Sequence, residues 1–274
     1  MPRNKAVTRD GIDISYEIHR GSGPGRCVLV HSLALDAEFW AGTVPYLIGD
    51  ADVLVYDCRG HGQSGQPAGA QPVERHADDL ADLLDAVGWQ SEVVAGASMG
   101  GCISLAFARH YPQRVDGLGL FDTTAWYGPD APKAWEERGQ KAMKEGMAAL
   151  IPFQKSRWVT EAFLASHPQV VEAAIKVFTA NRPEIYLETC RMLGAADIRD
   201  LPKFDFATRI AVGIEDYATP VAMAEALHAL IPGSSLTVFD KARHLTPLES
   251  PDRVGAEIKA LLDGARARQA KKSS

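Results

Sequence analysis

Long hydrophobic runs are absent from this 274-residue sequence. No window approaches the roughly 18 uninterrupted apolar residues of a membrane-spanning helix, which excludes such a span. The N-terminal segment, Met1–Thr8, also lacks the apolar stretch that a secretory signal peptide needs. We therefore expect a cytoplasmic chain that does not associate with membranes.

Cysteine and metal-binding motifs are equally scarce. The four cysteines lie far apart, and no pair has the C-x-x-C spacing of a metal or redox site. The eight histidines show neither the H-x-H nor the H-E-x-x-H spacing of metal ligands. We expect reduced, half-buried thiols, and neither a metal nor any other cofactor.

Positive charge is in deficit. The formal net charge is −6, and the basic stripe of a nucleic-acid surface is missing. The basic run at 265–274 is short, and we expect it to form a frayed, solvated tail. A hydrophobic fraction of 46% is enough for a sizeable core. We expect one large domain that binds a small-molecule substrate; a homo-oligomer is compatible with the sequence.

Short apolar runs divide the chain in a way that is typical of α/β proteins. Two strand-like runs, at 5–8 and 12–19, flank the turn signal Asp10-Gly11 and predict a hairpin. The later runs are continuously apolar, as in parallel strands buried on both faces. They lie at 27–31, 53–56, 93–96, 115–121, 210–213 and 236–239.

Helical patterns fill most of the intervals between these runs. Strands that alternate with helices predict an α/β fold with a mostly parallel sheet and helices on both faces. Residues 123–206 depart from this rhythm, because they contain several helical stretches but no buried strand. We expect a core formed by 1–122 and 207–274, with 123–206 inserted as a helical cap. The helical patterns of the core lie at 73–87, 99–110, 219–230 and 251–263.

One serine stands in the most informative motif of the sequence. The segment Gly96–Gly100 has the pattern G-x-S-x-G with Ser98 at its centre, a strand before it and a helix after it. In that context the serine occupies a sharp turn that holds its hydroxyl clear of the backbone. The helix also points its N-terminus at the developing negative charge. We predict that Ser98 is a nucleophile.

The chain order of nucleophile, acid and histidine that accompanies this motif locates the partners of Ser98. His244 is the only histidine after the last predicted strand, and it lies near the carboxyl end of that strand. Ligand sites of open parallel sheets lie at such strand ends. The preferred acid is Asp216, and Asp122 is the alternative. The acid would hold the imidazole tautomer and stabilise the imidazolium.

The oxyanion hole should consist of two backbone N–H groups. One is expected from Met99, the residue after the nucleophile. The other should come from the loop after the strand at 27–31, where we favour the Leu33 N–H. We expect His31 and the glycine-rich segment 57–64 to brace this region rather than to do chemistry.

Taken together, these segments resemble the α/β-hydrolase superfamily, and within it the 3-oxoadipate enol-lactonases. The resemblance spans residues 5–264. It implies a cofactor-free intracellular enzyme that acts on small carboxylated lactones from aromatic breakdown. It also places the acid at the aspartate of G-x-x-D-x-x-T-P, which is Asp216 here. The segments that carry the resemblance are 32–40, 55–64, 96–101, 110–115, 145–148, 212–220 and the loop around His244.

Two positions depart from the enol-lactonase pattern. Those enzymes tend to carry an arginine shortly after the strand that ends near Phe121, whereas this chain has Trp126. If that arginine holds a substrate carboxylate, this chain lacks it there. The oxyanion loop also carries Ala34 where glycine is usual. We expect Trp126 and Trp135 of the cap to line the substrate pocket.

The sequence therefore favours hydrolysis of a small, carboxylated lactone or ester through an acyl-enzyme. Hydrolysis of a carbon–carbon bond, amide hydrolysis and cofactor-free perhydrolase chemistry use the same triad, and the motifs do not separate them. An alternative of another class is a ligand receptor or signalling protein on a hydrolase scaffold, since fold does not fix function.

Overall fold

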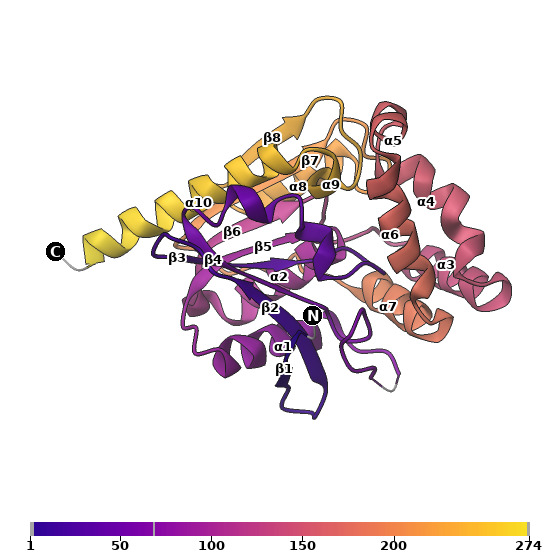
Figure 1. Cartoon of the computed structure of the whole chain (residues 1–274), viewed down its shortest axis with the longest axis horizontal. Coiled ribbons are helices and arrows are strands. Elements are labelled where there is room, and N and C mark those ends of the chain that lie inside the picture. The colour runs from indigo at the N-terminus through magenta and orange to yellow at the C-terminus, as the bar shows by residue number, and fades with distance from the viewer. Residues whose placement is uncertain (1–2, 68, 273–274) are drawn as a thin grey trace.

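A mostly parallel sheet forms the centre of the molecule. The computed structural model describes residues 3–67 and 69–272 (Figure 1). Its strands there are ordered β1-β2-β4-β3-β5-β6-β7-β8. The pairs formed by β1 and β2 are antiparallel, and the remaining pairs are parallel. The predicted fold class is confirmed. The strands are Asn4–Val7, Asp13–His19, Gly25–Val30, Ala51–Tyr56, Glu92–Ala97, Val115–Phe121, Ala207–Gly213 and Ser235–Phe239.

Helices cover both faces of this sheet, which explains the continuously apolar strands. Every residue of β5 and β6 is buried. Helices α1 and α2 pack together on one face, while α10 lies across the other (Figure 1). Burial on both faces favours branched and aliphatic side chains without alternation. The core helices are α1 (Val73–Ala86), α2 (Met99–His110), α8 (Val221–Leu230), α9 (Thr246–Glu249) and α10 (Pro251–Lys272).

Five helices fill the chain between β6 and β7, and they gather at one end of the sheet (Figure 1). The two ends of this insert meet, because Trp126 and Asp197 form a β-bridge and the Ile198 N–H donates to the Ala125 carbonyl at 2.9 Å. We propose that residues 123–206 form a cap over the carboxyl end of the sheet. Its helices are α3 (Ala131–Glu145), α4 (Ile151–Trp158), α5 (Glu161–Ser166), α6 (Pro168–Ala180) and α7 (Pro183–Ala195).

The C-terminal helix is longer than the sequence pattern predicts. α10 continues across the basic run that we expected to fray. Ion pairs hold this extension to the core, Arg266 with Asp50 at 3.2 Å and Arg268 with Asp116 at 2.8 Å. The last two residues of the run lie outside the described residues. Neither α10 nor any other helix in the described ranges combines the length and apolar character needed to cross a bilayer.

Candidate active site

Ser98 occupies a strained turn between β5 and α2. Its backbone angles are φ 54° and ψ −118°, a combination that costs free energy for a residue with a side chain. The flanking glycines make the turn possible. A Cβ at Gly96 would lie 2.1 Å from the Gly100 carbonyl oxygen, and a Cβ at Gly100 would lie 2.1 Å from the Val30 carbonyl oxygen. The spacing of the motif therefore follows from backbone packing around the serine.

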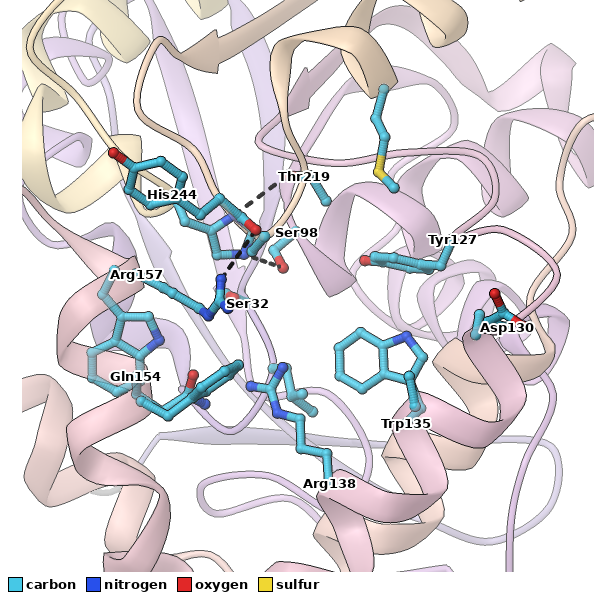
Figure 2. Close-up of a pocket in the computed structure, with 18 residues that line it drawn as sticks. Ser32, Ser98, Tyr127, Asp130, Trp135, Arg138, Gln154, Arg157, Thr219 and His244 are labelled. Atoms are coloured by element: carbon cyan, nitrogen blue, oxygen red, sulfur yellow. Dashed lines mark hydrogen bonds between the residues drawn. The ribbon is translucent and has the colours of Figure 1, made fainter.

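His244 and Asp216 form a continuous hydrogen-bonded chain with Ser98 (Figure 2 shows the serine and the histidine). The Nε2 atom of His244 lies 3.0 Å from the Ser98 Oγ, and its Nδ1 lies 2.8 Å from the Asp216 Oδ2. All three side chains are buried. With Nδ1–H donating to the carboxylate, Nε2 can accept the serine proton as the hydroxyl attacks a carbonyl.

The Asp216 carboxylate is fixed by the turn that follows it. Its Oδ1 accepts the Ala218 N–H at 2.7 Å and the Thr219 N–H at 2.9 Å, and its Oδ2 accepts the Thr219 hydroxyl at 2.8 Å. Burial raises the pKa of Asp216, but the interaction with the adjacent His244 and these hydrogen bonds outweigh it, so that the pKa lies below its ordinary value. The Asp216 carboxylate is therefore ionised and directed at the His244 imidazole.

Asp122, the alternative acid, bonds elsewhere. Its Oδ2 accepts the N–H and the hydroxyl of Thr246 at 2.9 and 2.7 Å, and its Oδ1 accepts the Gly213 N–H at 3.3 Å. Burial and the nearby charge of Asp216 raise the pKa of Asp122 well above its ordinary value. Asp122 thus joins the ends of two loops, and the geometry favours Asp216 over Asp122 as the acid.

The two amides expected to form the oxyanion hole lie beside Ser98. Leu33 and Ser98 line the same cavity, and Met99 is the first residue of α2. In the described chain, neither the Leu33 nor the Met99 N–H donates a hydrogen bond to a protein acceptor. The next loop residue, Ala34, has φ 57°, a left-handed conformation that glycine adopts at lower cost. That conformation gives a physical reason for the glycine expected there.

His31 stabilises the oxyanion loop through hydrogen bonds of its ring to two backbone groups. Its Nε2 accepts the Cys58 N–H at 2.9 Å, which leaves Nδ1 to donate to the Ser32 carbonyl at 2.8 Å. Burial lowers the pKa of His31, so the ring is held neutral. These contacts make His31 a bracing residue, as the sequence suggested.

A cavity of about 320 Å³ opens beside Ser98, between the core and the cap (Figure 2). The core contributes the triad, the oxyanion loop and the loop after β7. The cap contributes aromatic and polar side chains from the loop before α3 and from α3 and α4. The cap residues around the cavity include Tyr127, Trp135, Arg138, Phe153, Gln154 and Arg157.

Two arginines reach this cavity that the sequence motifs did not identify. The Arg138 Nε donates to the Tyr186 hydroxyl at 2.7 Å, and its guanidinium lies 4.8 Å from the centre of the Trp135 ring. The Arg157 Nη1 donates to the Tyr217 carbonyl at 3.1 Å, while its Nε is buried without a partner in the described chain. The available signal was the spacing of Trp135 and Arg138, which places them on one helix face.

Of the two tryptophans expected in the pocket, only Trp135 is among the described residues that line it. The expectation for Trp126 needs correction. Trp126 belongs to the stem of the cap, the place where its backbone bridges to Asp197. The Arg199 guanidinium lies 3.8 Å from the centre of the Trp126 ring. Trp126 is thus held by contacts with Asp197 and Arg199 and does not line the cavity.

Comparison with known proteins identifies the family and agrees with the fold. A family model described as alpha/beta hydrolase fold matches residues 27–251. A 3-oxoadipate enol-lactonase of Acinetobacter baylyi is 26% identical, over 93% of this chain and 95% of its own. The crystal structure of the enol-lactonase from Burkholderia xenovorans is 29% identical, with a TM-score of 0.89 over 95% of this chain and 100% of its own. A malate-bound thermophilic esterase from Thermogutta terrifontis is 30% identical, with a TM-score of 0.87 over 97% and 99%.

The chain belongs to the alpha/beta hydrolase family. It is an enzyme of the hydrolase class, and the expected resemblance to 3-oxoadipate enol-lactonases is confirmed.

Proposed function

We propose that this hydrolase cleaves small carboxylated esters or lactones through an acyl-enzyme on Ser98. The observation that carries the reaction is the continuous contact from the Ser98 Oγ through His244 to Asp216. Relatives named as enol-lactonases and an esterase support the substrate class.

The proposed reaction has two stages. In the first, the Ser98 hydroxyl attacks the substrate carbonyl, His244 takes its proton, and the Leu33 and Met99 amides stabilise the oxyanion. His244 then donates that proton to the leaving oxygen. In the second stage, His244 takes a proton from a water molecule that attacks the acyl-enzyme; the ester bond to the Ser98 Oγ breaks, that oxygen receives the proton from His244, and the acid is released. For a lactone, both products remain one molecule, a hydroxy acid or its keto form.

The cap arginines support a carboxylated substrate. The enol-lactonase arginine is missing at Trp126, but Arg138 and Arg157 bring two guanidinium groups to the same cavity. Guanidinium binds carboxylate with directional, charge-assisted hydrogen bonds. The two guanidinium groups at this cavity are therefore the reason to expect a carboxylated ligand.

A pair of substrates of matched size tests this proposal. We expect p-nitrophenyl hydrogen succinate to be hydrolysed with a kcat/KM about 10–100-fold above that of p-nitrophenyl butyrate, the gain of a charged hydrogen bond. Arg157→Met and Arg138→Met should remove this preference while butyrate hydrolysis stays near the wild-type rate. Equal kcat/KM for the two esters in the wild type would contradict the carboxylate part of the proposal.

Turnover number tests the enzyme against its alternatives. A receptor on this scaffold would hydrolyse its ligand about once, whereas the proposal requires many turnovers for each active site. A panel that includes an amide, a carboxylated enol-lactone, a vinylogous diketone and peracid formation distinguishes ester and lactone hydrolysis from the other reactions that the same triad supports.

A further inference from the structure

The loop that carries the catalytic histidine is fastened to the cap. This histidine loop, residues 240–245, connects β8 with α9. The His244 N–H donates to the Arg157 carbonyl at 3.3 Å, and the Leu245 N–H donates to the Trp158 carbonyl at 2.8 Å. Both acceptors lie at the end of α4, and both residues also line the cavity. The base of the triad therefore takes main-chain support from the cap.

The Glu249 carboxylate bridges the same two segments. Its Oε1 accepts the Thr160 N–H at 2.9 Å and also the Thr160 hydroxyl. Its Oε2 accepts the Arg243 N–H at 2.8 Å. Thr160 is buried at the start of α5, and Arg243 directly precedes His244. Only a side chain with two acceptor oxygens can serve all these donors at once.

Arg243 adds a second bridge through its guanidinium. Its Nη1 donates to the Ser156 and Val159 carbonyls of the cap, each at 3.2 Å. Its Nε donates to Glu215 at 3.3 Å, and Glu215 directly precedes the catalytic acid. One side chain thus joins the cap edge, the histidine loop and the acid loop.

Thr246, the residue that directly follows the histidine loop, is fixed to the core. There Asp122 accepts the N–H and hydroxyl of Thr246, so one support belongs to the sheet and the other to the cap. A shift of the cap edge would move one support and leave the other in place. The distance of 3.0 Å between His244 and Ser98 would then change, and a misplacement of about 1 Å can cost about 100-fold in rate.

We propose that Glu249 is a positioning residue that couples the cap to His244, so that the cap sets the geometry of the triad as well as covering the pocket. The inference rests on the proposed function. It assigns Glu249 no contact with the substrate, since its bonds go to Thr160 and Arg243. Its effect should therefore appear in kcat and be independent of the acyl group.

Glu249→Gln tests the coupling, because the amide presents an N–H₂ group to one of the two donor sites. We expect kcat to fall about 10–100-fold for both p-nitrophenyl hydrogen succinate and p-nitrophenyl butyrate, with KM changed less than about threefold. The proton NMR signal of the hydrogen bond between His244 and Asp216 should shift or broaden. Glu225→Gln, an exposed change on α8, is the matched control and should leave both readouts unchanged.

Thr160 supplies the rescue. Thr160→Val removes the hydroxyl that donates to Glu249 and should lower kcat. Thr160→Ser keeps that hydroxyl and should have a kcat near the wild-type value. The proposal is overturned if Glu249→Gln keeps the wild-type kcat and NMR signal, if it changes KM alone, or if only the carboxylated ester is affected. If the wild type turns over neither ester, the proposed function fails, and the NMR signal together with the rate of Ser98 labelling by a fluorophosphonate still tests the coupling.

Discussion

At the scale of single residues, the site depends on a few positions with unusual backbone or unusual surroundings. Ser98 and Ala34 both have positive φ, and both belong to the machinery that would attack a carbonyl and stabilise its oxyanion. Strain of this kind persists only where the surrounding structure enforces it. Here the enforcing contacts are the close approach of Gly96 to Gly100 and the ring of His31 beneath the loop.

Ser98→Ala removes the nucleophile and nothing else of structural weight. Alanine keeps the Cβ, so the turn is preserved, while turnover of p-nitrophenyl esters should fall on the order of 10⁶-fold. Steady-state kinetics with circular dichroism checks both parts. Near-wild-type rates in a folded variant would exclude Ser98 as the nucleophile.

The two buried aspartates should respond differently to the same change. Asp216→Asn should lower kcat about 10⁴-fold, because the amide stabilises the wrong imidazole tautomer. Asp122→Asn should cost no more than about 100-fold, the effect of disturbing one support of the histidine loop, because its carboxyl contacts Thr246 and Gly213 instead of the imidazole. Kinetics of the two variants under identical conditions decide the assignment, and the reverse order would make Asp122 the acid.

At the scale of elements, β5 leads into Ser98 at its end and buries an unpartnered carboxyl group, that of Glu92, at its beginning. Glu92 opens this strand, is 1% exposed, and has both carboxylate oxygens buried without a partner in the described chain. Burial raises the pKa of Glu92 from 4.5 to about 7. The folded protein therefore resists ionisation of this carboxyl, whereas the unfolded chain does not.

The free energy of unfolding should consequently decrease as the pH rises, because Glu92 ionises more readily in the unfolded chain. Between pH 4.5 and about 7 the unfolded state loses the Glu92 proton first, so ionisation favours unfolding, and the loss is complete above about pH 7. Glu92→Gln should match the wild type near pH 4 and exceed it by about 3 kcal/mol above pH 7. Urea unfolding at several pH values measures the difference, with Glu225→Gln as control. A gain that is independent of pH would refute this origin.

The part of the site that the sequence could predict is the part set by local backbone rules. The G-x-S-x-G motif, the order of strands and helices, and the positions of Asp216 and His244 all follow from chain order and strand ends. The cap is different, because its helices face the core through tertiary packing. For Arg138 the only local signal is its spacing from Trp135, and nothing local to Arg157 indicates that it reaches the cavity, or to Trp126 that it pairs with Arg199.

At the scale of the whole molecule, the long C-terminal helix ties distant parts of the sheet together. Its extension pairs Arg266 with the turn before β4 and Arg268 with the start of β6. Exposed ion pairs contribute little singly, but these hold eight further residues of helix against the core.

A chain that ends at Gly264 should therefore melt earlier without losing activity. We expect a decrease in melting temperature of about 2–6 °C for the loss of one or two kcal/mol, with kcat at 25 °C within about twofold of the full chain. Differential scanning fluorimetry and ester hydrolysis measure the two. An unchanged melting temperature would show that the extension contributes nothing to stability.

The bridge between Trp126 and Asp197 has a consequence for how such enzymes diversify. Trp126 and Asp197, near the two ends of the cap, are bridged. The insert therefore connects to the core as a short loop would. Closing a loop whose ends already meet adds little entropy cost, even when its length changes greatly. A cap of different size or chemistry could therefore be joined to the core at this bridge and change the substrate range, provided that it keeps the contacts of the present cap with His244 and Glu249.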